Sequence, residues 1–109
     1  MEAYEKIQAN PTSLLIYETL LEYLNTLGEY SVEKKKSSLH IVKDRAFLGV
    51  HPRSNGLLLN IVTAEPIVNR MIRKTEQVSA NRYHNELLIT DKDEINGSLK
   101  KLISKAYEL

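Results

Sequence analysis

The chain has 109 residues, which fits one domain, and its 42% apolar residues are enough for a modest core. It has no cysteine, which excludes disulfides, thiolate metal sites and a cysteine nucleophile. The net charge is only +1, but residues 31–84 carry ten Lys or Arg against four acidic residues. No apolar run is long enough to span a bilayer and the start does not resemble a secretory signal. We therefore expect one soluble cytoplasmic domain over residues 1–109, with residues 1–9 as an N-terminal extension.

Apolar residues recur at helical spacing from residue 12 to residue 27, which predicts an amphipathic helix there. Thr12 or Ser13 can cap its start, and Gly28 follows the last periodic residue, where a helix C-terminus favours glycine. The apolar stripe is broad, which suggests more than one neighbour for this helix.

Short segments of strand character follow, at residues 38–43, 46–51, 57–63 and 84–89, with a less regular one at residues 73–78. Asp44 and Arg45 predict a turn, and Asn55-Gly56 predicts a hairpin. Because Pro52 has no N–H, we expect a three-residue hairpin loop with Gly56 in the left-handed conformation. Thr90 or Asp91 then opens a C-terminal helix whose apolar face carries Ile95, Leu99, Leu102, Ile103 and Ala106.

This order of elements predicts an α+β fold, with an antiparallel sheet of four or five strands and an N-terminal and a C-terminal helix packed on one face. Strand alternation assigns a uniformly apolar set to the helix-covered face: Leu39, Ile41, Leu48, Val50, Leu59, Ile61, Leu87 and Ile89. The opposite face is expected to be mixed, with His40, Val42, Phe47, His51, Arg53, Leu58, Asn60, Val62, His84 and Leu88.

A mixed face is where a ligand or a partner is expected. His51-Pro52-Arg53 and Arg82-Tyr83-His84 suit phosphate or carboxylate contact, because Arg offers a planar fork of donors. The three histidines share this face but lack the spacing of a metal site, so we expect neither metal nor cofactor. The complete candidate surface for a ligand or partner is His51, Arg53, Asn60, Arg73, Arg82 and His84.

Apart from Arg53, the basic residues of the middle region are Lys34, Lys35, Lys36, Lys43, Arg45, Arg70, Arg73, Lys74 and Arg82. They can form one patch for nucleic acid, although lysines on a strand edge also prevent sheets from pairing. Few aromatic residues lie nearby to stack on bases, so we expect weak, sequence-tolerant and salt-sensitive contact.

Several blocks of the chain resemble a bacterial family known only as a domain of unknown function, number fifty-six fifty-five. The blocks are Asn10-Pro11-Thr12, Tyr17-Glu18-Thr19-Leu20, Leu27-Gly28, Lys35 to His40, Phe47 to Val50, Arg73 to Asn85 and Ala106-Tyr107-Glu108. The resemblance runs from about residue 9 to the end. It implies a module that stands alone or follows other regions, some nuclease-like, and that is sometimes labelled "predicted transport protein". It implies no catalytic residue.

Three functions are compatible with these observations. The first is a non-enzymatic binding module for a protein or for an anionic ligand such as nucleic acid. The second is a small enzyme acting on a phosphorylated or carboxylated substrate through His51, Arg53, Arg82 and His84. The third is a homodimeric structural module, because the broad helix stripe and the mixed sheet face leave apolar surface for self-association or for a protein partner.

Overall fold

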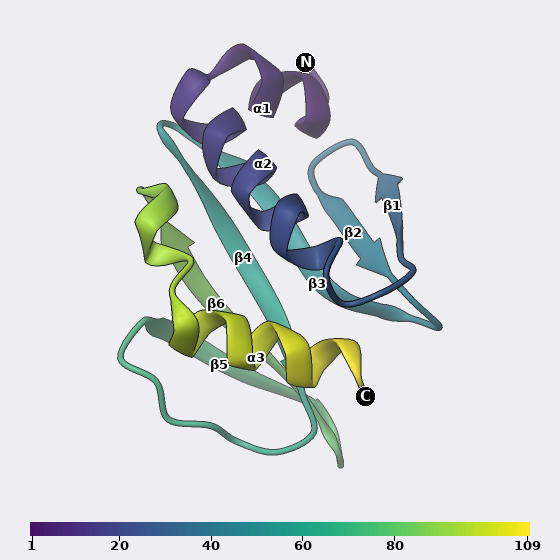
Figure 1. Cartoon of the computed structure of the whole chain (residues 1–109). Coiled ribbons are helices and arrows are strands. Elements are labelled where there is room, and N and C mark those ends of the chain that lie inside the picture. Colours follow the sequence, from purple (N-terminus) through teal and green to yellow (C-terminus); the bar gives the residue numbers. More distant parts are fainter.

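A computed structural model describes residues 1–109 as a six-stranded antiparallel sheet with its helices on one face (Figure 1). The strand order is β1-β2-β3-β4-β6-β5. The elements in chain order are α1 (Ala3–Ala9), α2 (Pro11–Leu24), β1 (Ser31–Lys34), β2 (Leu39–Val42), β3 (Ala46–Arg53), β4 (Gly56–Thr63), β5 (Ile72–Ser79), β6 (Arg82–Ile89), the 3₁₀ turn η1 (Lys92–Glu94) and α3 (Gly97–Tyr107).

The α+β class is confirmed, but the expected four or five strands are six. The strand missing from the prediction is β1, which has only four residues and is largely exposed. Val32 is its single apolar residue, so the alternation that reveals a strand is absent from this segment.

Residues 1–9 were expected to be an extension and instead form α1. Glu2 and Glu5 make a reciprocal capping box at its start. Ala3 and Ile7 are fully buried, and the Ala3 N–H donates to the Lys36 carbonyl at 2.8 Å. The first residues of the chain are therefore part of the core.

Helix α2 begins at Pro11, so Thr12 and Ser13, which were expected to cap it, lie inside its first turn. The cap is Asn10, whose Oδ1 accepts from the Ser13 N–H at 3.0 Å, and Pro11 fits the first helical position because its missing N–H is not needed there. The helix ends at Leu24, and Gly28 lies beyond three turn residues with φ of 135°.

The β3–β4 hairpin has a two-residue loop, not the expected three-residue one. Arg53 faces Gly56, and the left-handed residue is Asn55, with φ of 54°. The buried Ser13 on α2 secures this end of the sheet: its hydroxyl donates to the Gly56 carbonyl at 2.8 Å and accepts from the Gly56 N–H at 3.1 Å.

The core lies between the sheet and the helices. All eight residues assigned by alternation to the helix-covered face are buried, which confirms that face. Phe47 was expected on the other face, but it belongs to this core and packs edge-on against Tyr107, with ring centroids 5.4 Å apart. The β2–β3 register shifts between Ile41 and Val42, and this bulge breaks the alternation next to Phe47.

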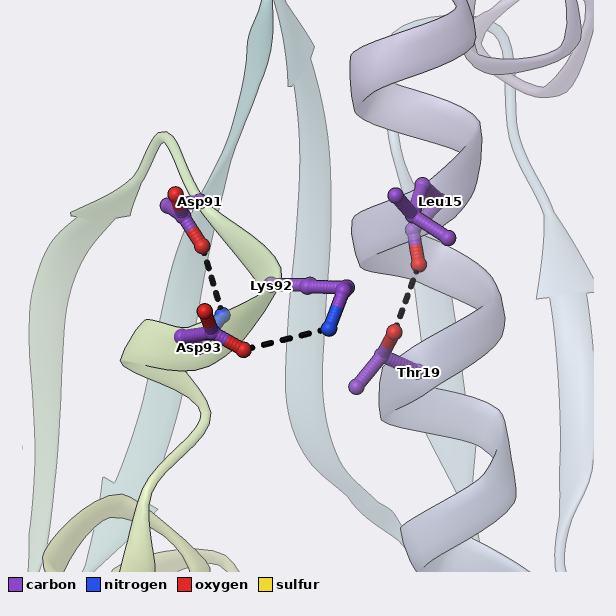
Figure 2. A network of polar contacts seen from close by, with 5 residues as sticks. All are labelled: Leu15, Thr19, Asp91, Lys92 and Asp93. Atoms are coloured by element: carbon purple, nitrogen blue, oxygen red, sulfur yellow. Dashed lines mark hydrogen bonds and ion pairs between the residues drawn. The ribbon is translucent and has the colours of Figure 1, made fainter.

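The C-terminal helical region has two parts. Asp91 caps η1 by accepting from the Asp93 N–H at 2.8 Å, and Lys92 pairs with Asp93 at 3.1 Å, as Figure 2 shows beside α2. Asn96 then caps α3 by accepting from the Leu99 N–H. The Thr19 hydroxyl of α2 donates to the Leu15 carbonyl within its own helix (Figure 2). These contacts are local and structural.

Part of the apolar surface expected outside the core is covered, and Leu15, Val78 and Leu88 stay exposed. The neighbours of α2 are α1, β4 and η1, which account for its broad stripe. Leu58 and Val62 on the opposite sheet face are also buried. No helix combines the length and the apolar composition that crossing a membrane requires.

Candidate ligand-binding site

Three of the predicted site residues share the sheet face away from the helices. His51 lies on β3, Asn60 on β4 and His84 on β6, and strand pairing aligns Gly49, Asn60, Glu86 and Lys74 in one row across four strands. The predicted mixed polar face therefore exists. Its residues stand on rigid central strands.

A small hollow of about 70 Å³ lies within this face, lined by Asn60, Lys74, Glu76, His84 and Glu86. Two buried polar atoms of its lining residues, Asn60 Oδ1 and His84 Nε2, have no hydrogen-bond partner in the protein. The predicted Arg73 lies beside this row, where its Nε is 3.9 Å from a Glu86 carboxylate oxygen. The hollow has room for little more than water-sized groups.

Burial lowers the pKa of both histidines on this face. For His51 the further causes are the Arg53 and His40 charges, opposed by Glu86. For His84 the nearby Arg82 charge lowers the pKa further, and Glu76 opposes it. Both imidazoles therefore stay neutral at a lower pH than a free histidine side chain does.

The two predicted arginine sites do not converge. Arg82 Nη2 donates to the Ala46 carbonyl at 2.9 Å, at the start of β3, whereas Arg53 is the last residue of that strand. Ala46 and Arg53 lie seven positions apart along this extended strand, which is roughly 23 Å. Arg53 is exposed, and its Nη1 donates at 2.8 Å to the carbonyl of its neighbour Pro52. His51, Arg53, Arg82 and His84 therefore do not form one pocket.

A larger hollow of about 420 Å³ surrounds Arg82 at the end of the sheet. Three segments that are distant in sequence form it: the β2–β3 turn, the β5–β6 turn and the end of α3 (Figure 1). It carries three cations, Lys43, Arg45 and Arg82, against the single aspartate Asp44. None of the three cations forms an ion pair with a carboxylate. We call this hollow, with these three cations, the basic hollow.

Arg82 is held in place at the basic hollow. One of its five N–H donors is used by the Ala46 carbonyl, so the rest of the guanidinium fork stays free for a ligand. Burial, and next the charge of Arg45, lower the pKa of Arg82. Two neighbouring guanidinium groups that raise each other's energy are stabilised when an anion binds between them.

Aromatic packing positions Lys43, the third cation. Its Nζ lies 4.2 Å from the ring centroid of Tyr107, and the Tyr107 hydroxyl donates to the Glu29 carbonyl at 2.9 Å. Gly28 leaves the space for this hydroxyl, because a Cβ at Gly28 would lie 2.6 Å from it. Gly28 was predicted as the helix cap, but the cap is Asn25, and Gly28 instead leaves the space that places Tyr107.

The predicted single basic patch is divided by the fold. Lys34, Lys35 and Lys36 lie at the β1–β2 turn, and Lys34 Nζ is 3.9 Å from the ring centroid of Tyr4 on α1. Lys43 and Arg45 lie at the other end of β2. The sequence predicted the cations of the basic hollow, but it placed Phe47 on the other sheet face and gave Tyr107 no role, because only the bulge and the helix end bring these rings beside the cations.

Comparison with known protein families gives one match. The family described as "Domain of unknown function (DUF5655)" matches residues 3–109. The chain belongs to this family. The DUF5655 match includes α1, so it begins earlier than the resemblance read from the sequence.

No curated protein and no solved structure gave a match. The DUF5655 description names no activity and no ligand, so no residue role carries over from it. The candidate site therefore rests on the geometry of this chain.

Proposed function

We propose that this domain is a non-enzymatic binding module that takes a phosphate-bearing ligand in the basic hollow. The observation that carries the proposal is the convergence of Lys43, Arg45 and Arg82, all without carboxylate partners, around one hollow. Hydrogen bonds between such cations and phosphate oxygens are charge-assisted, and Arg can bind two oxygens at once.

The volume of the hollow agrees with a small ligand or with one segment of a polymer. About 420 Å³ is within the range of small-molecule sites. A wider hollow of about 920 Å³ shares Lys43, Asp44 and Tyr107 with it, which leaves room for a longer ligand to continue along the surface. Phe47 and Tyr107 are buried, so they support the cations and do not offer faces for base stacking.

The alternative of a small enzyme using His51, Arg53, Arg82 and His84 has no support from this geometry. Arg53 is the last residue of β3, whereas Arg82, the first residue of β6, bonds the carbonyl of Ala46 at the start of β3. Phosphate binding at the basic hollow needs no general base or nucleophile, and Arg82 bonds a backbone carbonyl, that of Ala46, rather than a histidine or a serine hydroxyl.

A binding titration tests the proposal. The probes are pyrophosphate, a free nucleotide and a short single-stranded oligonucleotide, which share phosphate chemistry and differ in size. Arg45→Ala should weaken the affinity for the best probe about tenfold or more, because it removes a charge-assisted contact. The matched control is Lys35→Ala, which removes one positive charge at the opposite end of β2.

Oligonucleotide affinity should also fall with added salt, with a log–log slope of roughly −2 for three phosphate contacts. Equal losses in Arg45→Ala and Lys35→Ala would show that net charge, and not the basic hollow, drives binding. Failure of all three probes to bind would defeat the proposal.

A further inference from the structure

The edge strand β5 is the least covered element of the fold. It lies at one end of the strand order and pairs only with β6. Residues 73–79 are exposed, on the helix side of the sheet as well as on the other side. Its outward backbone groups are therefore available to another strand.

The other edge strand is shorter, and its charged groups are engaged. β1 has four residues, and two of its charged groups are engaged: Lys34 over the Tyr4 ring and Glu33 with Lys35 at 3.8 Å. β5 is twice as long, has no proline and exposes Val78 at 43%, and it is regular from Lys74 to Gln77, between bulges at Arg73 and Val78. Short length and charged side chains discourage strand pairing. The longer β5 therefore offers more backbone to another strand than β1 does.

The sequence of β5 is complementary to itself in the antiparallel direction. With Thr75 facing its own copy, Lys74 faces Glu76, and both lie in the regular stretch of β5 from Lys74 to Gln77, between the bulges at Arg73 and Val78. Lys74 and Glu76 lie on the same face of the sheet, because they pair with Glu86 and His84 of β6, which share the face away from the helices. Each copy then contributes one Lys74–Glu76 pair, and opposite charges on facing strands stabilise a sheet.

We propose that two copies of this chain associate through β5 in this register, about a two-fold axis through Thr75, so that one antiparallel sheet runs through both. The occupant is a second copy because the charge complementarity is to β5 itself, and a two-fold contact uses it twice. The inference is independent of the basic hollow. It replaces the apolar surface first expected to drive self-association, since α1, β4 and η1 pack against the α2 stripe, and Phe47, Leu58 and Val62 are buried.

Charge reversal tests the register. Lys74→Glu alone and Glu76→Lys alone each place like charges opposite one another twice, and each should raise the dimer dissociation constant about tenfold or more in sedimentation. The double variant K74E/E76K restores opposite charges and should restore dimerisation. Lys101→Glu, at an exposed position of α3, is the control, and thermal unfolding of each variant confirms folding.

Disulfide trapping gives a second readout, because the chain has no cysteine of its own. In the proposed register Thr75→Cys lies directly opposite its copy, at the Cα separation that a disulfide requires, and should cross-link rapidly under mild oxidation. Gln77→Cys lies about 13 Å from its copy along the strands and should not. A wild-type chain that stays monomeric at millimolar concentration, a double variant as weak as the single ones, or equal cross-linking at both positions would overturn the proposal.

Discussion

At the scale of single residues, a few polar side chains fix where the layers meet. Ser13 joins α2 to the β3–β4 hairpin, and Tyr107 joins α3 to the segment before β1. The sequence predicted Thr12 or Ser13 as the helix cap, but the cap is Asn10, and Ser13 instead bonds Gly56, 43 residues away. Long-range hydrogen bonds of this kind leave no periodic pattern in the sequence.

Ser13→Ala should lower the free energy of unfolding by about 1–3 kcal/mol, because it leaves the buried Gly56 N–H and carbonyl without their side-chain partner. Urea unfolding measures the change. Thr19→Ala is the matched control: its hydroxyl bonds an exposed carbonyl one turn earlier in the same helix, and its loss should change stability by less than about 0.5 kcal/mol. Equal effects of both changes would contradict the assigned role.

Acid should destabilise the fold through His51 and His84. Their pKa values in the folded chain are lowered below 6.5, mainly by burial, so the unfolded chain binds protons first as the pH falls. The stability that they contribute is therefore complete above pH 6.5 and is lost as the pH falls from 6.5 through the lowered pKa values. The melting temperature should fall in this window, and less so in His51→Gln/His84→Gln. If the melting temperature falls equally with pH in the wild-type chain and in the double variant, the histidines are not the cause of the acid sensitivity.

At the scale of elements, residues with a clear period were predicted and short or irregular ones were not. The buried sets of β2, β3, β4 and β6 follow from alternation, since each of these strands has one face on the core. β1 and α1 were missed, because one carries a single apolar residue and the other is only seven residues long. Phe47 was placed on the wrong face, since a bulge cannot be read from the sequence pattern.

Because α1 is packed into the core, its buried side chains should contribute to the stability of the domain. Ile7→Ala should destabilise the domain by about 2–5 kcal/mol, because the side chain is fully buried and its loss leaves a cavity. Chemical unfolding provides the test, with Leu15→Ala as the control, since Leu15 is 48% exposed on α2. A loss below about 1 kcal/mol for Ile7→Ala would mean that α1 behaves as the extension first expected.

At the scale of the whole molecule, the fold divides the charge of the middle region between two ends of the sheet. Lys34 to Lys36 gather beside α1, and Lys43, Arg45 and Arg82 gather at the basic hollow. The candidate ligand residues were therefore predicted in part: Arg82 was named for the site and belongs to the hollow, whereas Arg53 lies far from it. Which cations converge depends on strand order, and strand order was not deduced from the sequence.

The most direct measurement for the central claim is an amide chemical-shift map of the wild-type chain titrated with pyrophosphate. We expect the largest saturable shifts at residues 43–46 and 79–82, the two turns that line the basic hollow, with small shifts at residues 34–36. In Arg45→Ala the same shifts should require about tenfold more ligand. Saturable shifts centred on residues 34–36, or shifts spread over every lysine and arginine without saturation, would contradict a built phosphate site at this end of the sheet.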